Sequence, residues 1–590
     1  MNTPTCFGVD LGTTNSAAGI VKNGQIVMVV DKSGKQLVPS YVCFPPNGRP
    51  PMIVGNPARN LLRNKPTGVI FDCKRLIGMK YTDPIVNTMR QYSPFDIVDD
   101  GNGKPQIAVI QDGKERRQYP EEIGAFVLEQ LRENAGRLAG NDSIKDVVIT
   151  VPAYFNQKQR QATKDAGVLA GLNVLEIISE PVAAAYAYAD TNNLDQDGKE
   201  KTIMIYDLGG GTFDVTIMSV KGSQYKEIGL DGDLFLGGSD FDLKLMNHVI
   251  SIYKRNGGCD LNAKKLGKLR FKCEELKTSF ISLQSGEIAI DDDDDDPIEI
   301  TRATLEYLLK PEIQKTLDIC DRVIKTCGKT IDDIDDIILV GGSSRLHIVH
   351  TMLEEHFHKK LHENINPDEC VAYGATKYAY SITTGLIDQH SKMKPVEVEV
   401  TCPSDIGVRN GDKMYVMIKR GQTLPCSSSV LFANSTDYAQ EASISVYQGN
   451  SPLVVENMLL REIRVRITKP LPRGQNTFLL RLEMDKKGSL SAFVQDQLTK
   501  AEGRINNIQQ YYTEDEMGKM TDRVKEVQKK KDEYERLVKM INDYQQYCQG
   551  LMANTTDPVR RQQLVEISNG LSQCKSLDEL VPYYHALTGN

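Results

Sequence analysis

Residues 7–14 read Phe7-Gly-Val-Asp-Leu-Gly-Thr-Thr14, and residues 205–212 read Ile205-Tyr-Asp-Leu-Gly-Gly-Gly-Thr212. In both segments an apolar strand ends at an aspartate, Leu-Gly and small residues follow, and a second apolar strand resumes at 17–21 or 215–220. Because one pattern recurs with the aspartate at the same place, the sequence predicts two homologous lobes, each of about 190 residues, that face each other.

These glycine-rich turns are typical of phosphate-binding loops. Glycine lets backbone N–H groups approach an anion closely, because no Cβ intervenes, and threonine hydroxyls can add further donors. Asp10 and Asp207 precede the two turns, and two carboxylates beside a polyphosphate require a cation between them, for which Mg²⁺ is the natural choice. The predicted phosphate-binding residues are Gly12, Thr13, Thr14, Asn15, Gly209, Gly210, Gly211 and Thr212.

A third glycine turn, Val340-Gly-Gly-Ser-Ser-Arg345, follows an apolar strand at 336–340. Its glycines allow close approach to a purine, and a guanidinium can stack on the face of the base. The turn therefore predicts a nucleoside site that involves Gly341, Gly342, Ser343 and Arg345.

The chain divides by pattern into four parts. Residues 1–385 alternate β-branched runs with amphipathic helical stretches, which indicates an α/β domain. We expect an interdomain linker at 386–399, an all-β domain of short, turn-punctuated strands at 400–497, and a helical part at 498–590 that includes a capping box at Thr513-Glu-Asp-Glu516. Six consecutive acids at 291–296 are interpreted as a solvated hairpin tip rather than a calcium site, because the spacing of a calcium loop is missing.

Composition excludes several classes of function. The net charge is −8 and no long basic block occurs, so nucleic acid is an unlikely partner. No apolar stretch approaches the roughly 18–20 residues that span a bilayer, and the N-terminus does not resemble a secretory signal, so no membrane partner is expected. The twelve cysteines show no paired or metal-ligand spacing, which favours free thiols in a reducing compartment and a cytoplasmic location.

The chain resembles the 70-kDa heat-shock protein (DnaK-type) family across essentially residues 5–500. The matching strings are Gly8-Val-Asp-Leu-Gly-Thr-Thr-Asn-Ser16, Phe71-Asp-Cys-Lys-Arg-Leu-Ile-Gly78, Val148-Ile-Thr-Val-Pro-Ala-Tyr-Phe155, Gln159-Arg-Gln-Ala-Thr-Lys-Asp-Ala-Gly167, Ile205–Val215, Leu236-Gly-Gly-Ser-Asp-Phe-Asp242 and Ile365-Asn-Pro-Asp-Glu369. The resemblance implies an actin-like two-lobed ATPase domain, followed by an all-β sandwich peptide-binding domain and a short α-helical lid.

The resemblance also implies roles for individual residues. Lys74 would orient or activate the attacking water, and Glu180 would hold that water or a magnesium ligand. Asp10 and Asp207 would hold Mg²⁺ mainly through water, and Asp214 would lie near a monovalent cation such as K⁺. The catalytic set is Lys74, Glu180, Asp207 and Thr212, and the remaining ATP/ADP contacts are Glu274, Lys277, Arg345 and Asp368.

Three departures from the family pattern stand out. Thr278 occupies a position where the family carries an arginine against the adenine, which predicts weaker ATP binding. The leucine-rich linker of the family is replaced by Val396-Glu-Val-Glu399, which would impair docking unless the segment pairs as an edge strand with its valines inward. The expected peptide-contacting residues are Val408, Phe432, Ala442 and Ile444, and the small Ala442 predicts weak or altered peptide preference.

The resulting hypothesis is an ATP-dependent chaperone that binds unfolded or extended polypeptides, with a J-domain co-chaperone and a nucleotide-exchange factor as partners. The alternative is a non-cycling regulator, a holdase or a nucleotide-exchange partner of another chaperone. A sugar kinase or actin-like filament would share the ATPase fold but would not explain residues 400–497. The family's acidic Glu-Glu-Val-Asp terminus is missing, so tetratricopeptide co-chaperones are not expected.

Overall fold

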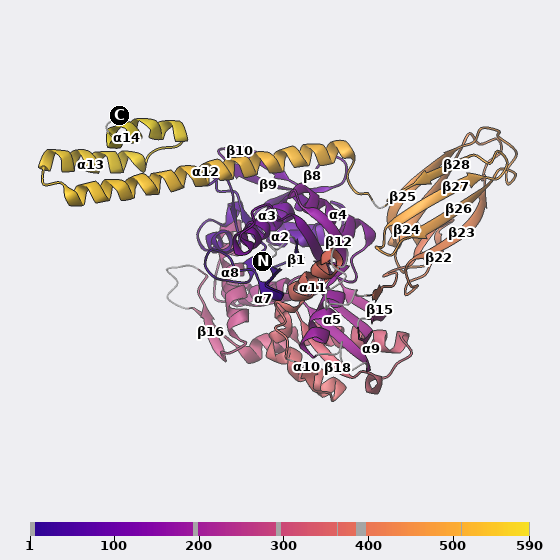
Figure 1. The fold of residues 1–590 in the computed structure, drawn as a ribbon. Helices are drawn as coiled ribbons and strands as arrows, with labels where there is room; N and C mark the ends of the chain where they lie inside the picture. Colours follow the sequence, from indigo (N-terminus) through magenta and orange to yellow (C-terminus); the bar gives the residue numbers. More distant parts are fainter. Residues whose placement is uncertain are drawn as a thin grey trace.

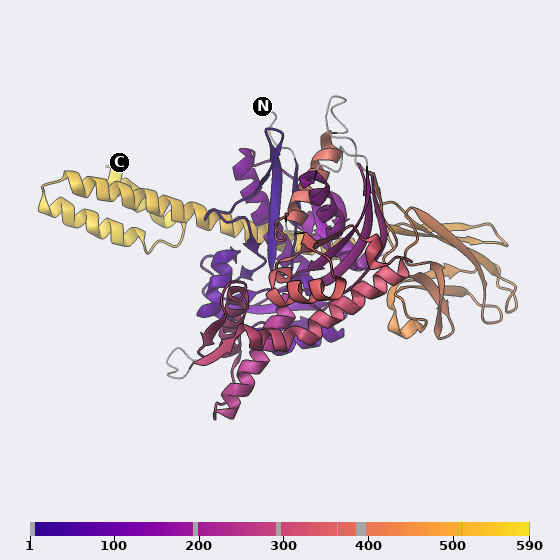
Figure 2. The same ribbon diagram turned by 90° about the horizontal axis from the view of Figure 1, so that it is seen from below.

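The computed structural model describes residues 6–192, 199–222, 224–290, 297–362, 364–384, 397–508 and 510–588. The predicted acidic hairpin tip at 291–296 and most of the predicted linker lie outside the described residues. The chain forms a two-lobed α/β part, a β-sandwich on one side of it and a helical C-terminal part that projects from the other (Figures 1 and 2).

The first lobe is built on a six-stranded sheet of order β12-β11-β1-β2-β3, with β4 paired to β2. Its strands are β1 (Cys6–Asp10), β2 (Asn15–Lys22), β3 (Gln25–Met28), β4 (Val38–Pro39), β11 (Asp146–Val151) and β12 (Asn173–Ser179). Two smaller sheets contain β5 (Val42–Cys43), β6 (Ile53–Val54) and β7 (Val69–Ile70), and β8 (Asp96–Asp99), β9 (Pro105–Gln111) and β10 (Lys114–Gln118). The helices of this lobe include α1 (Asn56–Asn60), α2 (Pro84–Tyr92), α3 (Pro120–Ala139) and α4 (Gln157–Leu169).

The second lobe repeats this plan with the sheet order β19-β18-β13-β14-β15-β20. Its strands are β13 (Glu200–Leu208), β14 (Phe213–Lys221), β15 (Gln224–Asp233), β18 (Asp336–Val340), β19 (Leu361–His362) and β20 (Glu397–Glu399). Helices α7 (Gly238–Arg255), α8 (Ala263–Ser279), α9 (Arg302–Thr326) and α10 (His347–Phe357) and the hairpin of β16 (Ser285–Ile288) and β17 (Ile298–Thr301) complete it.

The two lobes pair their first strands in the same way. β1 pairs antiparallel with β2 and parallel with β11, and β13 pairs antiparallel with β14 and parallel with β18. The predicted repeat at 7–14 and 205–212 is therefore a repeat of strand, turn and strand. Helices α5 (Glu180–Thr191) and α11 (Cys370–Thr384) pack against each other between the sheets, in a core rich in alanine and tyrosine.

The end of the predicted linker forms an edge strand. Strand β20 pairs in parallel with β15, so that Val398 lies opposite Tyr225 and Glu399 opposite Lys226. Val398 and Val400 pack against the buried core between the lobes, whereas Glu399 remains exposed. Val398 and Val400 thus face inward, as the edge-strand alternative required, whereas Val396 lies outside the described residues.

The β-sandwich has two antiparallel sheets, of order β22-β21-β24-β25 and β23-β26-β27-β28. Their strands are β21 (Ile406–Asn410), β22 (Lys413–Ile418), β23 (Cys426–Ala433), β24 (Glu441–Gln448), β25 (Met458–Arg466), β26 (Thr477–Met484), β27 (Leu490–Asp496) and β28 (Glu502–Ile505). The predicted boundary at 497 needs correction, because β28 pairs with β27 and Ile508 is buried in the sandwich core. The sequence does not indicate β28 as a strand, because it is a polar edge strand with little apolar alternation.

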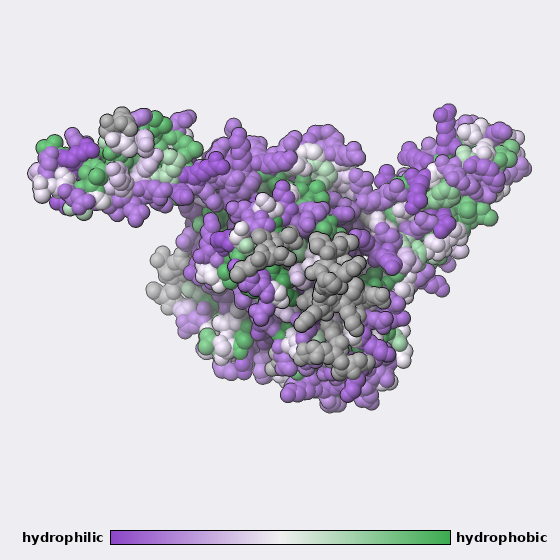
Figure 3. Space-filling view, in the orientation of Figure 1, coloured by the Kyte–Doolittle hydropathy of each residue, from purple (hydrophilic) through white to green (hydrophobic). Residues whose placement is uncertain are grey.

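The C-terminal part consists of α12 (Glu514–Asn554), α13 (Pro558–Leu571) and α14 (Leu577–Thr588). The capping box predicted at Thr513 and Glu516 is present at the start of α12. The first half of α12 lies along the first lobe, and α13 and α14 pack against its far end (Figure 1). On the visible face, apolar residues form patches at this far end, on the sandwich and at several places on the two-lobed part (Figure 3). Within the described ranges, no helix combines the length and apolarity needed to cross a bilayer.

Candidate active site

A cavity of about 300 Å³ lies between the two lobes, where the duplicated strand ends meet. Asp10 ends β1 and Asp207 lies near the end of β13, and both line this cavity. Equivalent positions in two facing lobes therefore bring the two predicted aspartates into one site. The cavity wall also contains the predicted residues Gly12, Thr13, Thr14, Asn15, Lys74, Glu180, Gly209, Gly210, Thr212, Glu274, Lys277, Gly341, Gly342, Ser343, Arg345 and Asp368.

Lys74 and Glu180 form a buried ion pair on the cavity wall. Lys74 Nζ lies 2.7 Å from Glu180 Oε1, and the two side chains are 6% and 10% exposed. Lys74 comes from the single turn η3 (Cys73–Arg75), and Glu180 begins α5. The ammonium group is thus fixed by a carboxylate at the start of α5, and both side chains line the cavity.

Burial and mutual repulsion disfavour the ionised form of the remaining carboxylates. Burial, with the neighbouring charge of Glu180, raises the pKa of Asp10 to about 7 and that of Asp214 to about 7, and it raises the pKa of Asp207 well above its usual range. Asp207 and Asp214 lie opposite each other on β13 and β14. One lysine cannot balance four acids in a buried site, so the cluster fits a bound cation.

The donor set indicates how such a cation would be held. The described residues contain no cluster of three or more side chains able to hold a metal by themselves. Asp10 and Asp207 supply two carboxylates at a cavity large enough for water and phosphate, and Mg²⁺ is often bound in that way. The residues therefore fit Mg²⁺ held partly by water and phosphate.

Asp214 lies behind the cavity wall and does not line it. Its Oδ1 accepts a hydrogen bond from Tyr154 N at 3.0 Å, and its Oδ2 is buried without a described partner. Gly211, also predicted to bind phosphate, is likewise off the wall, and its carbonyl oxygen accepts from Arg75 Nη2 at 2.9 Å. These two predicted residues therefore lie next to the cavity and are not part of its wall.

The two glycine hairpins approach each other closely. A Cβ atom placed on Gly210 would lie 2.1 Å from Thr14 Oγ1, across the cleft between the lobes. A side chain at this position would force the loops apart, so close approach explains the glycine. The backbone N–H groups and hydroxyls of both lobes can then surround one anion.

The part of the cavity between α8 and the Gly341 turn has side chains suited to binding a nucleoside. Helix α8 contributes Glu274, Lys277 and Thr278, and the Gly341 turn contributes the opposite wall. Gly341 has a φ of 81°, a left-handed conformation that favours glycine. Arg345 is held by Asp368, with Nε 2.8 Å from Oδ2, so its guanidinium keeps a fixed orientation.

Thr278 leaves the α8 side of this pocket without a second guanidinium. Its hydroxyl donates to the carbonyl oxygen of Glu274 at 2.8 Å, and Ile281 lines the pocket beside it. Sequence reasoning missed Ile281 and Leu37 as wall residues, because an isolated apolar residue carries no signal of a binding site.

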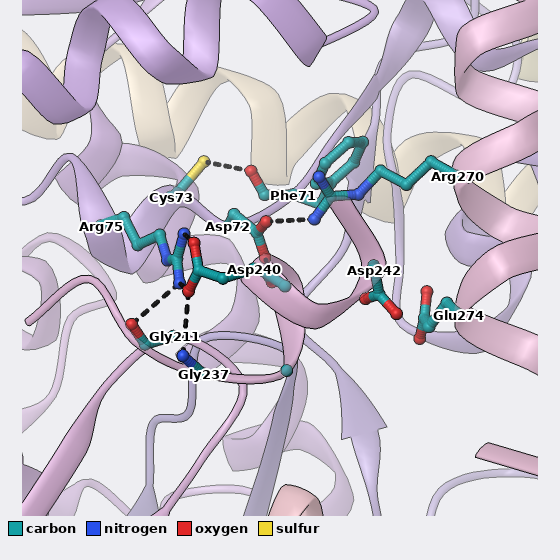
Figure 4. Close-up of polar contacts among 12 residues, drawn as sticks. Phe71, Asp72, Cys73, Arg75, Gly211, Gly237, Asp240, Asp242, Arg270 and Glu274 are labelled. Atoms are coloured by element: carbon teal, nitrogen blue, oxygen red, sulfur yellow. Dashed lines mark hydrogen bonds and ion pairs between the residues drawn. The ribbon is translucent and has the colours of Figure 1, made fainter. Parts of the chain in front are cut away.

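Further contacts tie the two lobes together above the cavity (Figure 4). Arg75 binds the carboxylate of Asp240, and Arg270 Nη2 lies 2.5 Å from Asp72 Oδ2. No role for these four residues could be inferred from the sequence. In the sequence they stand out only by their position near predicted site residues. Asp72 and Arg75 lie within two residues of Lys74, and Arg270 precedes Glu274 by one helical turn.

The predicted peptide-contacting residues lie in the sandwich, away from this cavity. Val408 on β21 and Ile444 on β24 are 8% and 7% exposed and belong to the sandwich core. Phe432 stacks on Phe478 with a centroid separation of 5.2 Å, and Ala442 on β24 is partly buried against the same core cluster. The four side chains thus pack against one core cluster, and a peptide groove at these positions stays a prediction.

Comparison with known proteins gives two findings. The model of the Hsp70 protein family matches residues 6–579. The chain is also 37% identical over 510 residues to heat shock 70 kDa protein 2 of the fungus Paracoccidioides lutzii, which covers 85% of this chain and 76% of that protein.

Proposed function

The chain belongs to the Hsp70 family, and from this premise we propose that it is an ATP-dependent molecular chaperone that binds unfolded polypeptide segments. Members of this family are chaperones with ATPase activity that bind ATP or ADP with Mg²⁺, unfolded polypeptides, and J-domain and nucleotide-exchange co-chaperones. The observation that carries the proposal is the buried pair of Lys74 and Glu180 beside Asp10 and Asp207, at the junction of the duplicated lobes.

Binding would be divided between the two walls of the cavity. The N–H groups of the two glycine hairpins and the hydroxyls of Thr13, Thr14 and Thr212 would hold the phosphates. The nucleoside would lie between α8 and Arg345. Asp10 and Asp207 would hold Mg²⁺ through water, and when bound this ion would neutralise charge on the phosphate oxygens.

Hydrolysis requires little more of the protein than positioning and neutralisation of charge. In this proposal the Lys74 ammonium orients the attacking water and stabilises negative charge at the terminal phosphate. Glu180 fixes that ammonium, and it can accept a hydrogen bond from the same water. Asp214 would lie near a monovalent cation, K⁺ in this proposal, for which the unpartnered Oδ2 is the supporting observation.

Coupling to polypeptide binding would run through the docked sandwich. Thr401, directly after β20, binds the buried Glu227 of β15 through its backbone N–H and its hydroxyl. Gln157 N of α4 donates to Gln448 Oε1 of the sandwich at 3.1 Å. The linker, both lobes and the sandwich are therefore in direct contact. The twelve free cysteines support a reducing compartment, the cytoplasm, as part of the proposal.

ATP turnover of the purified chain tests the proposal, first alone and then with an unfolded model protein and a J-domain protein. We expect turnover that both additions stimulate. We also expect Lys74→Ala to lower turnover by about a hundredfold or more while nucleotide still binds. The matched control is Lys114→Ala, at an exposed lysine of β10, which should hydrolyse ATP normally.

Two outcomes would contradict the proposal. Turnover unaffected by Lys74→Ala would mean that the measured activity does not come from this site. Turnover that neither polypeptide nor J-domain changes would favour the alternative of a non-cycling regulator or holdase over a working chaperone cycle.

A further inference from the structure

The backbone at Asp72 is held in an unusual conformation by the opposite lobe. Asp72 has a φ of 56° and a ψ of 20°, in the left-handed region, and it immediately precedes the turn that carries Lys74. Left-handed backbone is costly for a residue with a side chain and persists where the surroundings enforce it. The structure therefore has to contain groups that hold Asp72 in place.

Both carboxylate oxygens of Asp72 are bound by the second lobe, and Figure 4 shows the contact with Arg270. Arg270 Nη2 lies 2.5 Å from Oδ2, and Ser239 Oγ donates to Oδ1 at 3.1 Å. The Arg270 guanidinium also lies over the ring of Phe71, 4.5 Å from its centroid. Because Arg270 and Asp72 are only 8% and 6% exposed, either charge would be left buried without this partner if the other were lost.

The far end of the same turn is held by the second lobe as well. Arg75 ends η3 and binds both Asp240 at the start of α7 and the carbonyl oxygen of Gly211. Lys74 lies between these two anchors and turns the other way, toward Glu180 of its own lobe. The position of the lysine thus depends on contacts with both lobes.

Helix α8 links this clamp to the nucleoside pocket. Arg270 precedes Glu274 by four residues and Lys277 by seven, so all three lie on one face of the helix, and the latter two line the cavity. A rigid helix that moves with the nucleoside wall must carry Arg270 with it. Opening of the wall would therefore release Asp72.

We propose that Arg270 is a positioning residue, which holds Asp72 and through it the Lys74 turn, so that hydrolysis is efficient only while α8 is closed over the nucleotide. The inference rests on the ATPase activity proposed above. It assigns to Arg270 and Asp72 a role in the hydrolysis step that is distinct from nucleotide binding, and neither residue lines the cavity.

The chain offers a matched control on the same helix. Arg63 Nη2 lies 2.8 Å from Glu275 Oε1 and also joins the lobes across the cleft. This pair is exposed, at 56% and 43%, and Arg63 belongs to the separate turn η1 (Leu61–Arg63). Glu275→Gln therefore removes a cross-lobe contact without touching the Lys74 turn.

The test is single-turnover hydrolysis of pre-bound ATP, with nucleotide release measured separately on the full chain. Asparagine tolerates left-handed backbone, so Asp72→Asn removes the charge with little change of shape. We expect Asp72→Asn and Arg270→Gln each to slow the hydrolysis step by about tenfold or more, because a small displacement of a catalytic group is costly. The double variant should be no slower than either single variant, and Arg270→Lys should restore part of the rate.

A second readout does not depend on activity. Amide hydrogen exchange in the peptide spanning residues 71–79 should become faster in Asp72→Asn and Arg270→Gln but not in Glu275→Gln. If the Asp72 and Arg270 variants do not fold, Ser239→Ala removes the other bond to Asp72 without burying a charge and should show the same two effects in weaker form.

The outcomes separate this inference from the proposed function. A wild-type chain that hydrolyses no ATP contradicts the function itself. A wild-type chain that hydrolyses ATP while Asp72→Asn keeps its full single-turnover rate overturns the role of the clamp. Additive losses in the double variant, or an equal loss in Glu275→Gln, overturn it too, because they mean that cleft closure in general rather than this contact sets the rate.

Discussion

At the scale of single residues, Thr278 is the position in the nucleoside pocket where a side chain that could stack on the purine is missing. Arg345 can stack on one face of a purine, whereas the α8 side offers a threonine whose hydroxyl is already engaged by its own helix. A guanidinium over an aromatic ring contributes about 0.5–2 kcal/mol. We therefore expect Thr278→Arg to tighten ATP binding between about twofold and thirtyfold in a calorimetric titration.

The control for this prediction is a ligand without a base. Inorganic triphosphate should bind Thr278→Arg and the unchanged chain with similar affinity in the presence of Mg²⁺, because stacking requires a ring. A gain in affinity for triphosphate would indicate simple charge attraction, and no gain for ATP would show that the base does not lie against α8.

At the scale of secondary-structure elements, strand β20 joins the sequence of the sandwich to the sheet of the second lobe, so coupling between the domains can depend on it. Val398 packs against the core between the lobes, and Glu399 points outward, with Oε2 3.1 Å from Lys226 Nζ. An unpaired carboxylate buried at Val398 would cost several kcal/mol. We expect Val398→Asp to abolish stimulation of ATP turnover by polypeptide while basal turnover persists.

Glu399→Gln provides the comparison within the same strand. Its ion pair with Lys226 is more than half exposed on both sides, and exposed pairs contribute little. Stimulation should therefore be nearly unchanged in this variant. If both variants retained stimulation, the β20 pairing would not be the coupling element.

The same strand shows what could be predicted from sequence and what could not. The alternation of valine and glutamate fixes which side chains face inward, because strand periodicity is local. Most residues of the duplicated strand–Asp–Gly segments line the cavity, with Gly211 and Asp214 displaced behind its wall, and their binding of phosphate and cation stays a prediction. Contacts such as Arg270 with Asp72 could not be predicted, since the partners lie 198 residues apart and no local pattern pairs them, although Asp72 lies in the matching string Phe71–Gly78.

At the scale of the whole molecule, the docking of α12 on the first lobe is the contact that sequence reasoning missed entirely. Tyr512, Met520, Val524 and Val527 are buried in the core of that lobe. Ion pairs from Arg523 to Glu122 and from Lys531 to Glu133 flank this apolar seam. In the sequence these residues belong to an ordinary amphipathic helix, whose partner surface no local pattern identifies.

Tyr512 is the residue by which this docking can be weakened most selectively. Its hydroxyl donates to Glu121 Oε2 at 2.5 Å, and Glu121 is fully buried. Tyr512→Phe keeps the ring but leaves a buried acceptor without its donor, which costs about 1–3 kcal/mol. We expect energy transfer between dyes on α12 and the first lobe to report a smaller docked fraction in Tyr512→Phe, and an unchanged fraction would contradict the importance of this bond.

The same contact makes docking depend on pH. Burial raises the pKa of Glu121 to about 7, although the bonds from Tyr512 and Gly78 act in the opposite direction, and Asp165 of α4 adds to the rise. On undocking, Glu121 regains water and its pKa falls toward the usual value near 4.5. The docked state thus binds more protons between about pH 4.5 and about pH 7, so docking is strongest below this range, weakens as the pH rises across it by at most about 1.4 kcal/mol per pH unit, and levels off above it.

Titration of the docked fraction between about pH 5 and pH 8 checks this dependence, because the slope should lie below about pH 7 and vanish above it, and the groups around Glu121 supply its controls. Glu121→Gln keeps an acceptor for Tyr512 and removes the ionisable group, so its docked fraction should be nearly flat over this range. Glu133→Gln loses an ion pair of the same interface but keeps Glu121, and it should dock more weakly with the same pH slope. Burial also raises the pKa of Asp165 to about 6 and raises that of Glu122, which pairs with Arg523 of α12, so any slope that survives in Glu121→Gln should disappear when Asp165→Asn and Glu122→Gln are added. The glutamine introduced in Glu121→Gln cannot bind a proton. An unchanged slope in this variant would therefore mean that another group takes up the protons on docking.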